Sequence, residues 1–314
     1  MSKHQNQAES VIELEPSQSK NWWENLIVEQ PDYHTNYLNG FSHSMLNVFR
    51  GSVSVFHKKF ILGESTWKRS KAMDFGSAFH AWMLERNEFD DSVALQPTCA
   101  KRSKADKLVW EDFGIENKYR AWVTQGDLDE ILAMEQAILK DEEASKWMVH
   151  LKGVNEKMVC WQATKETLGA ACLMKCKPDR LLPSGLNFGN LETDVIVDLK
   201  TTLDVSPESV AKSAASFGYH CQASLYIDGV RALNGGRPCR HVSVFINKTA
   251  PYEVSCVEYS QEALEIGRDM NTQAIQELVE RLEFNNFKSR TSNRLIQVDL
   301  PHWYSARWNK ENGR

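Results

Sequence analysis

The sequence predicts an α/β fold in which a central mixed β-sheet is flanked by helices. Helical periodicity occurs towards both ends of the chain, whereas residues 156–200 include segments that alternate as strands do. The 314 residues are 42% hydrophobic and 25% charged, which is the composition of an ordinary globular protein. This balance excludes disordered, collagen-like and coiled-coil chains, and the length is sufficient to bury a sizeable core.

The N-terminal residues 1–35 are polar, without a sustained period, and predict a tail or arm before a domain over residues 36–314. They carry several acids and no continuous apolar stretch, which excludes a secretory signal or a transit peptide. No apolar run approaches the roughly 18 residues of a membrane helix. We therefore expect a cytoplasmic protein without membrane contact. Seven cysteines at unpatterned spacings favour reduced thiols.

The compact part is expected to begin near Phe41, where Ser42 or Ser44 could cap a helix that continues to Phe56. From residue 45 to residue 72, six basic residues stand against one acid, so this segment carries 6 − 1 = +5 in a chain of net charge −5. Both a solvated helix face and a phosphate-binding surface fit this charge. The basic residues are Arg50, Lys58, Lys59, Lys68, Arg69 and Lys71.

Three further segments precede the predicted strands. Residues 73–85 predict a helix, because Phe75, Phe79 and other apolar side chains recur at three- and four-residue steps. Residues 100–122 are polar and basic at their start and predict a loop. Residues 125–148 predict one or two helices.

The sheet is predicted from five segments. Residues 156–162, 171–179 and 194–201 read as strands, and the three resemble an antiparallel meander. The third is apolar enough to lie centrally in a sheet. Residues 206–229 predict a helical stretch. The remaining elements are two strands around Pro251 and an amphipathic helix, over 241–247, 252–259 and 261–282.

The third strand carries Asp198 and Lys200 on one face, because residues i and i+2 of a strand project to the same side. Asp179 ends the preceding strand, and a hairpin at residues 183–190 would lay it beside Asp198. Glu156 opens the strand before that. Three carboxylates at one sheet edge repel each other unless a hard cation lies among them, and oxygen ligands suit Mg²⁺ or Mn²⁺. An isolated D-x-K spacing, by contrast, is common by chance on surface strands.

Two helical patterns accompany these acids. Gln222 and Tyr226 lie four residues apart and therefore share a helix face, with two hydrogen-bonding tips on apolar stems. His80 lies one helical turn beyond Gly76, a residue that allows close backbone approach. Taken singly, His80 is typical of a histidine in a protein core, and the pair of Gln222 and Tyr226 is typical of an ordinary helix surface.

Taken in order, the motifs resemble the PD-(D/E)xK nuclease superfamily, and within it the exonuclease VIII or RecE-like 5′→3′ exonucleases. The resemblance covers roughly residues 40–300. Its motifs are Gly76-Ser-Ala-Phe-His80, Glu156, Lys175-Cys-Lys-Pro-Asp179, Asp198-Leu-Lys-Thr-Thr202 and Tyr219-His-Cys-Gln222-Ala-Ser-Leu-Tyr226. The loop between Asp179 and Asp198 is somewhat longer than in the family pattern.

The resemblance implies roles for these residues. Lys200 would orient or help deprotonate the attacking water, and Gln222 with Tyr226 would position the DNA strand and the acids. Asp179 and Asp198 would be the principal metal ligands. The full implied metal set is His80, Glu156, Asp179, Asp198 and the backbone carbonyl of Leu199, and the implied catalytic set is Lys200, Asp198, Asp179, Glu156, Gln222 and Tyr226.

The resemblance also favours the basic segment as a DNA-facing surface, with the 5′ phosphate at the N-terminus of its first helix. The implied DNA-binding residues are Ser42, Ser44, Arg50, Lys68, Arg69 and Lys71. The activity implied is a magnesium-dependent exodeoxyribonuclease that degrades one strand of linear duplex DNA in the 5′→3′ direction. The product would be a 3′ single-stranded overhang used in recombination by strand annealing, and Mn²⁺ would substitute for Mg²⁺.

The family further implies two partners, a RecT-like single-strand annealing protein and further copies of this chain in a toroidal homo-oligomer. No iron–sulfur cluster is expected, because Cys172 and Cys176 alternate within a strand and no cysteine follows Cys256. Two alternatives stay open. One is another PD-(D/E)xK nuclease, either an endonuclease or a helicase-associated nuclease, although no helicase motif is present. The other is a non-catalytic DNA-end-binding protein, against which the intact acid and lysine set speaks.

Overall fold

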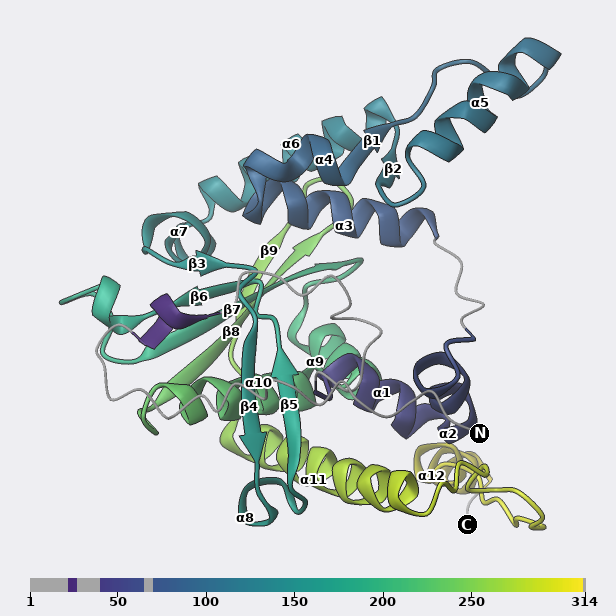
Figure 1. The fold of residues 1–314 in the computed structure, drawn as a ribbon, viewed down its shortest axis with the longest axis vertical. Helices are drawn as coiled ribbons and strands as arrows, with labels where there is room; N and C mark the ends of the chain where they lie inside the picture. Colours follow the sequence, from purple (N-terminus) through teal and green to yellow (C-terminus); the bar gives the residue numbers. More distant parts are fainter. Residues whose placement is uncertain (1–21, 27–39, 65–69, 313–314) are drawn as a thin grey trace, which may run out of the picture.

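The computed structural model describes residues 22–26, 40–64 and 70–312. Its centre is a five-stranded mixed sheet with helices on both faces, so the predicted α/β architecture is confirmed (Figure 1). The central pair is parallel and the other neighbours are antiparallel. In spatial order the strands are β3 (Val154–Asn155), β6 (Arg180–Leu182), β7 (Asp194–Thr202), β8 (Cys239–Asn247) and β9 (Val254–Val257).

Strand β7 divides the core into two apolar layers because its side chains alternate between the faces of the sheet. Val197 and Leu199 pack in a cluster with the helices α3 (Lys71–Leu84) and α6 (Gln125–Lys140). Ile196 points to the opposite layer, where α1 (His43–Gly51) and α10 (Tyr219–Leu233) lie. The first six residues of β7 are all buried, as expected for a central strand.

The N-terminal part begins with the short helix η1 (Trp22–Asn25), whose two tryptophans are buried in the core. Most of the predicted arm, residues 1–35, lies outside the described residues, and the division into arm and domain stays a prediction. Ser42 caps α1, because its Oγ accepts from the backbone N–H of Met45 at 3.4 Å. The predicted helix to Phe56 is interrupted, since Ser52 starts a new helix, α2 (Val53–Phe56).

The prediction of a loop over residues 100–122 is wrong. It contains the helix α5 (Lys104–Glu116), which starts with a reciprocal capping box between Ser103 and Asp106. None of the residues of α5 is buried, and the helix projects away from the sheet (Figure 1). Without a buried face there is no apolar period, which is why the sequence pattern did not indicate a helix. Two short parallel strands, β1 (Val93–Leu95) and β2 (Ala121–Val123), flank it.

The predicted antiparallel meander is also wrong. Strands β4 (Val159–Ala163) and β5 (Cys172–Cys176) pair with each other and form a hairpin separate from the five-stranded sheet, and β5 also forms a parallel bridge with Phe41. The chain then turns at Pro178, a residue without a backbone N–H, and the short strand β6 becomes the neighbour of β7. Asp179 nevertheless reaches the side of Asp198, because it immediately precedes β6 and the pairing places Arg180 opposite Val197.

The predicted helical stretch over 206–229 is two helices, α9 (Pro207–Phe217) and α10, separated by Gly218 in the left-handed conformation at φ 72°. The amphipathic helix predicted over 261–282 is α11 (Gln261–Glu283). The smaller helical elements are η3 (His57–Ile61), η4 (Arg86–Glu88), α4 (Phe89–Ser92), α7 (Glu142–Ser145), η5 (Lys146–His150), α8 (Lys165–Leu168) and η6 (Ser184–Leu186). Within the described ranges, no helix combines the length and the apolarity that a membrane span requires.

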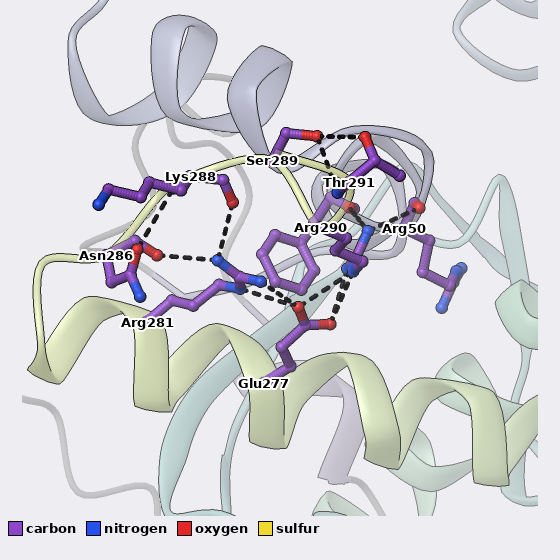
Figure 2. Close-up of polar contacts among 9 residues, drawn as sticks. Arg50, Glu277, Arg281, Asn286, Lys288, Ser289, Arg290 and Thr291 are labelled. Atoms are coloured by element: carbon purple, nitrogen blue, oxygen red, sulfur yellow. Dashed lines mark hydrogen bonds and ion pairs between the residues drawn. The ribbon is translucent and has the colours of Figure 1, made fainter. Parts of the chain in front are cut away.

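The loop after α11 is held in place by arginines, as Figure 2 shows. Glu277 on α11 pairs with Arg281 at 2.8 Å and with Arg290 at 2.7 Å. Arg290 also donates from Nη1 to the backbone carbonyls of Phe49 and Arg50, at 3.2 and 3.0 Å. This loop is therefore tied to the end of α1, and the chain continues from it to the terminal helix α12 (His302–Glu311), which has no buried residue.

Candidate active site

A closed polar triangle joins strand β7 to helix α10. Lys200 Nζ lies 2.6 Å from Asp198 Oδ2 and donates to Gln222 Oε1 at 3.0 Å. The Nε2 of Gln222 donates in turn to Asp198 Oδ1 at 3.0 Å. Asp198 is 1% exposed, so its charge is satisfied by these two partners rather than by bulk water. Asp198 and Lys200, which share one face of the strand, therefore meet the polar tip of Gln222 on the helix, as the sequence predicted.

Asp179 lies next to this triangle. Its Oδ2 accepts a hydrogen bond from the backbone N–H of Leu199 at 2.7 Å, which fixes the carboxylate against β7. The same oxygen lies 3.5 Å from Nδ1 of His80, which projects from α3. The strand, the turn before β6 and the helix thus each contribute one group to a single edge of the sheet.

Glu156 completes the cluster from the turn between β3 and β4. Its backbone is left-handed, at φ 53°, and its N–H donates to the carbonyl of Asp179 at 3.1 Å. Its side chain pairs with Lys177 at 2.7 Å. The sequence interpretation did not assign Lys177 a role, although its position two residues before Asp179 was an available signal.

The electrostatics of these carboxylates differ from one position to the next. Burial and the charge of nearby Asp179 raise the pKa of Glu156 to about 7, although Lys177 opposes the shift. Burial and the charge of Asp198 raise the pKa of Asp179 to about 7 as well. Both carboxylates are therefore held close together at a cost that a cation would relieve.

The Asp198 and Lys200 pair behaves in the opposite way. Burial alone would raise the pKa of Asp198, but the charge and hydrogen bond of Lys200, together with His241 and His80, hold this pKa below its usual value. Burial likewise opposes the charge on Lys200, yet Asp198 and Asp179 raise its pKa. Both groups are therefore charged at neutral pH.

Comparison with known proteins agrees with this geometry. A family profile described as a PDDEXK-like domain of unknown function (DUF3799) matches residues 42–291. The chain belongs to this PDDEXK-like family. It is therefore a member of the PD-(D/E)xK nuclease superfamily that the sequence motifs resemble. No curated protein matches the chain.

A solved structure supports the same fold for this PDDEXK-like chain. It comes from Eubacterium rectale and is described as a candidate exonuclease. The two share a TM-score of 0.56 and 14% sequence identity, with 84% of this chain and 92% of that chain covered. At this identity the likeness shows the fold alone.

The PDDEXK-like site has a donor set that fits a divalent metal ion. His80, Glu156 and Asp179 each offer one ligand atom, and these atoms lie within 4.8 Å of one another. Two carboxylates and an imidazole suit a hard or borderline divalent cation, and members of this superfamily depend on such a metal. Leu199 lies at the same point, because its backbone hydrogen-bonds both Asp179 and His80.

The other predicted site residues are placed less centrally. Tyr226 is 8% exposed and packs edge-on against His241, with ring centroids 6.4 Å apart. His241 was not predicted; burial lowers its pKa to about 4, and both of its ring nitrogens are buried without a hydrogen-bond partner. Its neighbour Ser243 lies opposite Asp198 in the sheet, so His241 belongs to the layer beneath the acid cluster.

The predicted DNA-binding residues divide into four groups. Ser42 is buried as the cap of α1, and its Oγ lies 3.0 Å from that of the exposed Ser44. Arg50 is directed towards α11, where its Nη1 donates to Asn271 at 2.9 Å. Lys71 is exposed and pairs with Asp127 at 3.3 Å. The remaining two, Lys68 and Arg69, lie outside the described residues.

Proposed function

We propose that this protein is a metal-dependent exodeoxyribonuclease that degrades one strand of linear duplex DNA from its 5′ end. The observation that carries the proposal is the adjacency of two sets of groups at one sheet edge. One is the charged triangle of Asp198, Lys200 and Gln222, and the other is the group of donors His80, Glu156 and Asp179. This pairing of a fixed ammonium with a metal-ligand cluster is suited to phosphodiester hydrolysis.

Lys200 is the group that would act on the reacting atoms. An ammonium has three N–H donors, and two directions are occupied by Asp198 and Gln222. The remaining one can contact the attacking water or a phosphate oxygen. Because its pKa is raised, Lys200 stays protonated and acts as a donor and positive charge rather than as a base. Gln222 prevents its side chain from turning away.

The metal would be held by His80, Glu156, Asp179, Asp198 and the backbone of Leu199. A bound Mg²⁺ or Mn²⁺ would supply a Lewis acid for the phosphate and an activated water at neutral pH. The residues of this chain preorganise the reacting groups, since Asp198 is almost fully buried and is held by Lys200 and Gln222. Mg²⁺ is proposed as the natural ion, because carboxylate oxygens dominate the set.

The DNA would follow the basic segment that begins at α1, and its 5′ phosphate would lie near Ser44. A net charge of −5 makes general attraction to DNA weak, so the positive charge has to be focused. A toroidal homo-oligomer with this segment lining its channel would provide such focusing, with the acidic surface outside. The 3′ overhang would pass to a single-strand annealing protein, and the cytoplasm is the proposed location.

Linear duplexes labelled at the 5′ or the 3′ end, with a covalently closed circle as control, test this proposal. In Mg²⁺ the 5′ label should be released from linear DNA, the 3′-ended strand should persist, and the circle should stay intact. Cleavage of the circle would identify an endonuclease instead. Full hydrolysis in excess chelator would refute metal dependence.

Lys200→Ala separates catalysis from binding in the same assay. We expect hydrolysis to fall by more than tenfold, or about 1.4 kcal/mol of barrier, while the affinity for duplex ends stays near that of the wild type. The matched control is Lys177→Ala, which also removes an ammonium from the cluster, but one that pairs with Glu156 rather than with Asp198, and should not abolish the rate at saturating metal. A Lys200→Ala protein with the wild-type rate would show that Lys200 does not act on the reacting atoms.

A further inference from the structure

A polar pocket of about 450 Å³ lies at the loop that follows α11, which Figure 2 shows in part. Four of the residues that line it are cations, namely Arg281, Lys288, Arg290 and Arg294. The other four lining residues are serines and asparagines, and none of the described residues that line the pocket is acidic. Guanidinium, ammonium, hydroxyl and amide donors without a carboxylate are suited to an oxyanion such as a phosphate.

Two of the four cations form the frame of this pocket. Arg281 donates from Nη1 to the backbone carbonyls of Asn286 and Lys288, at 3.0 and 3.1 Å. Arg281 and Arg290 both donate from Nε to Glu277, so the two guanidinium groups share this single carboxylate (Figure 2). Because one negative charge faces two positive charges, the frame is fixed and still carries an excess positive charge.

Lys288 and Arg294 are the two cations that remain to bind a ligand. Both residues are exposed, and neither side chain has an ion pair or a hydrogen bond within the described part of the chain. The two acids that follow Glu277 on α11, Glu280 and Glu283, are not among the residues that line the pocket. The charges of Lys288 and Arg294 are therefore not compensated by the protein itself.

Helix α1 connects this pocket with the candidate active site. At the N-terminal end of α1 the ring of His43 lies beside Gly218, where a Cβ would come within 3.5 Å of it, and Gly218 precedes the turn of α10 that carries Gln222. At the C-terminal end the backbone carbonyl of Arg50 accepts from Arg290 of the loop. The nine residues of α1 span about 14 Å at 1.5 Å per residue. This length is the rise of about four base pairs of duplex DNA.

The loop also adjoins the basic segment that the sequence predicted to face DNA. Phe287 of the loop stacks on His57 of η3, with ring centroids 4.4 Å apart and the rings 13° from parallel. Lys58 and Lys59 follow His57 directly. Two segments far apart in the sequence therefore contribute cations at adjoining positions, which favours an extended polyanion over a single small anion.

From these observations we infer that the pocket after α11 binds the phosphate backbone of the duplex substrate, about four base pairs from the end that the active site holds. Lys288 and Arg294 each pair with a backbone phosphate, while Arg281 and Arg290 fix the loop. The inference rests on the DNA path of the proposed function and adds a contact that the sequence interpretation did not assign. Its test measures binding rather than hydrolysis, so the pocket and the nuclease activity can fail separately.

The first measurement is the salt dependence of binding to a linear duplex, in excess chelator so that the DNA is not hydrolysed. The test variant combines Lys288→Gln with Arg294→Gln, which removes two charges from the pocket and keeps its frame. The control combines Lys140→Gln with Lys165→Gln, which removes two exposed charges from α6 and α8 and changes the net charge equally. The test variant should lower the salt slope by about two, because each lost phosphate contact lowers it by about 0.9. The control should keep the wild-type slope.

The second measurement places one neutral methylphosphonate linkage at successive positions from the end of the duplex. At 0.1 M salt the wild type should lose about eightfold in affinity when the neutral linkage lies three to six positions from the end, because one phosphate contact is removed. The test variant should be insensitive to the same linkages, since its contacts are already lost.

Three results would contradict these proposals in different ways. An unchanged salt slope in the test variant, or equal sensitivity of both proteins to every linkage, would overturn the inference and leave the nuclease proposal intact. The expected binding results without any hydrolysis in Mg²⁺ would support the pocket and overturn the nuclease proposal alone. A wild type that does not bind duplex DNA would overturn both.

Discussion

Asp179→Asn should stabilise the protein in the absence of metal. The folded carboxyl has a pKa of about 7 against an ordinary value of 3.8, so the charged form is disfavoured by folding. Each pH unit between these values costs 1.36 kcal/mol, which gives about 4 kcal/mol at pH 8 and about 2 kcal/mol at pH 5. This cost to folding is absent at low pH, where the carboxyl is protonated in both the folded and the unfolded state, and it is largest above the folded pKa, so the gain from Asp179→Asn should increase with pH. The amide can still accept the hydrogen bond from the N–H of Leu199.

Urea unfolding in excess chelator at pH 5 and pH 8 measures this gain. Asp198→Asn is the matched control of opposite sign, because the pKa of Asp198 is lowered and its charge is paired with Lys200. This variant leaves a buried ammonium without its carboxylate and should lose several kcal/mol. If Asp179→Asn were no more stable than the wild type at pH 8, or gained equally at both pH values, the carboxylate would not be electrostatically strained.

Three further predictions follow from the same structure. The apparent affinity for Mg²⁺, measured by calorimetry, should rise by up to about tenfold per displaced proton between pH 6 and pH 7, because Glu156 and Asp179 have pKa values of about 7; a flat profile would contradict this. Gly76→Ala should raise stability by about 1 kcal/mol, because the added methyl meets nothing within 4 Å in the described structure. It should also raise the KM for duplex ends, because Gly76 lies one helical turn before His80 on α3; an unchanged KM would place the substrate elsewhere. Reversal of Lys68, Arg69 and Lys71 to Glu should weaken the affinity for duplex DNA and lower the slope of its salt dependence by about three. A salt titration of duplex binding measures this, and an unchanged slope would mean that these residues form only a solvated face.

The acids of the site could be predicted from the sequence because their geometry is local. The two-residue period of a buried strand places Asp198 and Lys200 on one side, and the four-residue period of a helix presents Gln222. These relations hold whatever the order of the strands. The proximity of Asp179 was predicted for the wrong topology, since it lies before β6 and not at the end of a meander strand.

Features that depend on tertiary contacts could not be predicted in the same way. The Lys177 pair with Glu156 forms only because a left-handed turn at Glu156 brings β3 to the sheet edge. The separate hairpin of β4 and β5 follows from packing against α10 rather than from any pattern within the strands. Helix α5 has no buried face, so no apolar period existed to indicate it.

The site combines groups that weaken the fold with neighbours that fix them. The charges of Glu156 and Asp179 repel each other in a partly buried position, and such strain persists only where the surrounding structure is rigid. Gly267 supplies part of that rigidity, because a Cβ there would lie 2.5 Å from the carbonyl oxygen of His220, and α11 therefore packs directly on the backbone of α10. This close contact fixes the helix that carries Gln222, and through it the ammonium of Lys200. The rigid packing of α10 thus holds the charges of Asp198 and Lys200 in a geometry that a looser protein would relax.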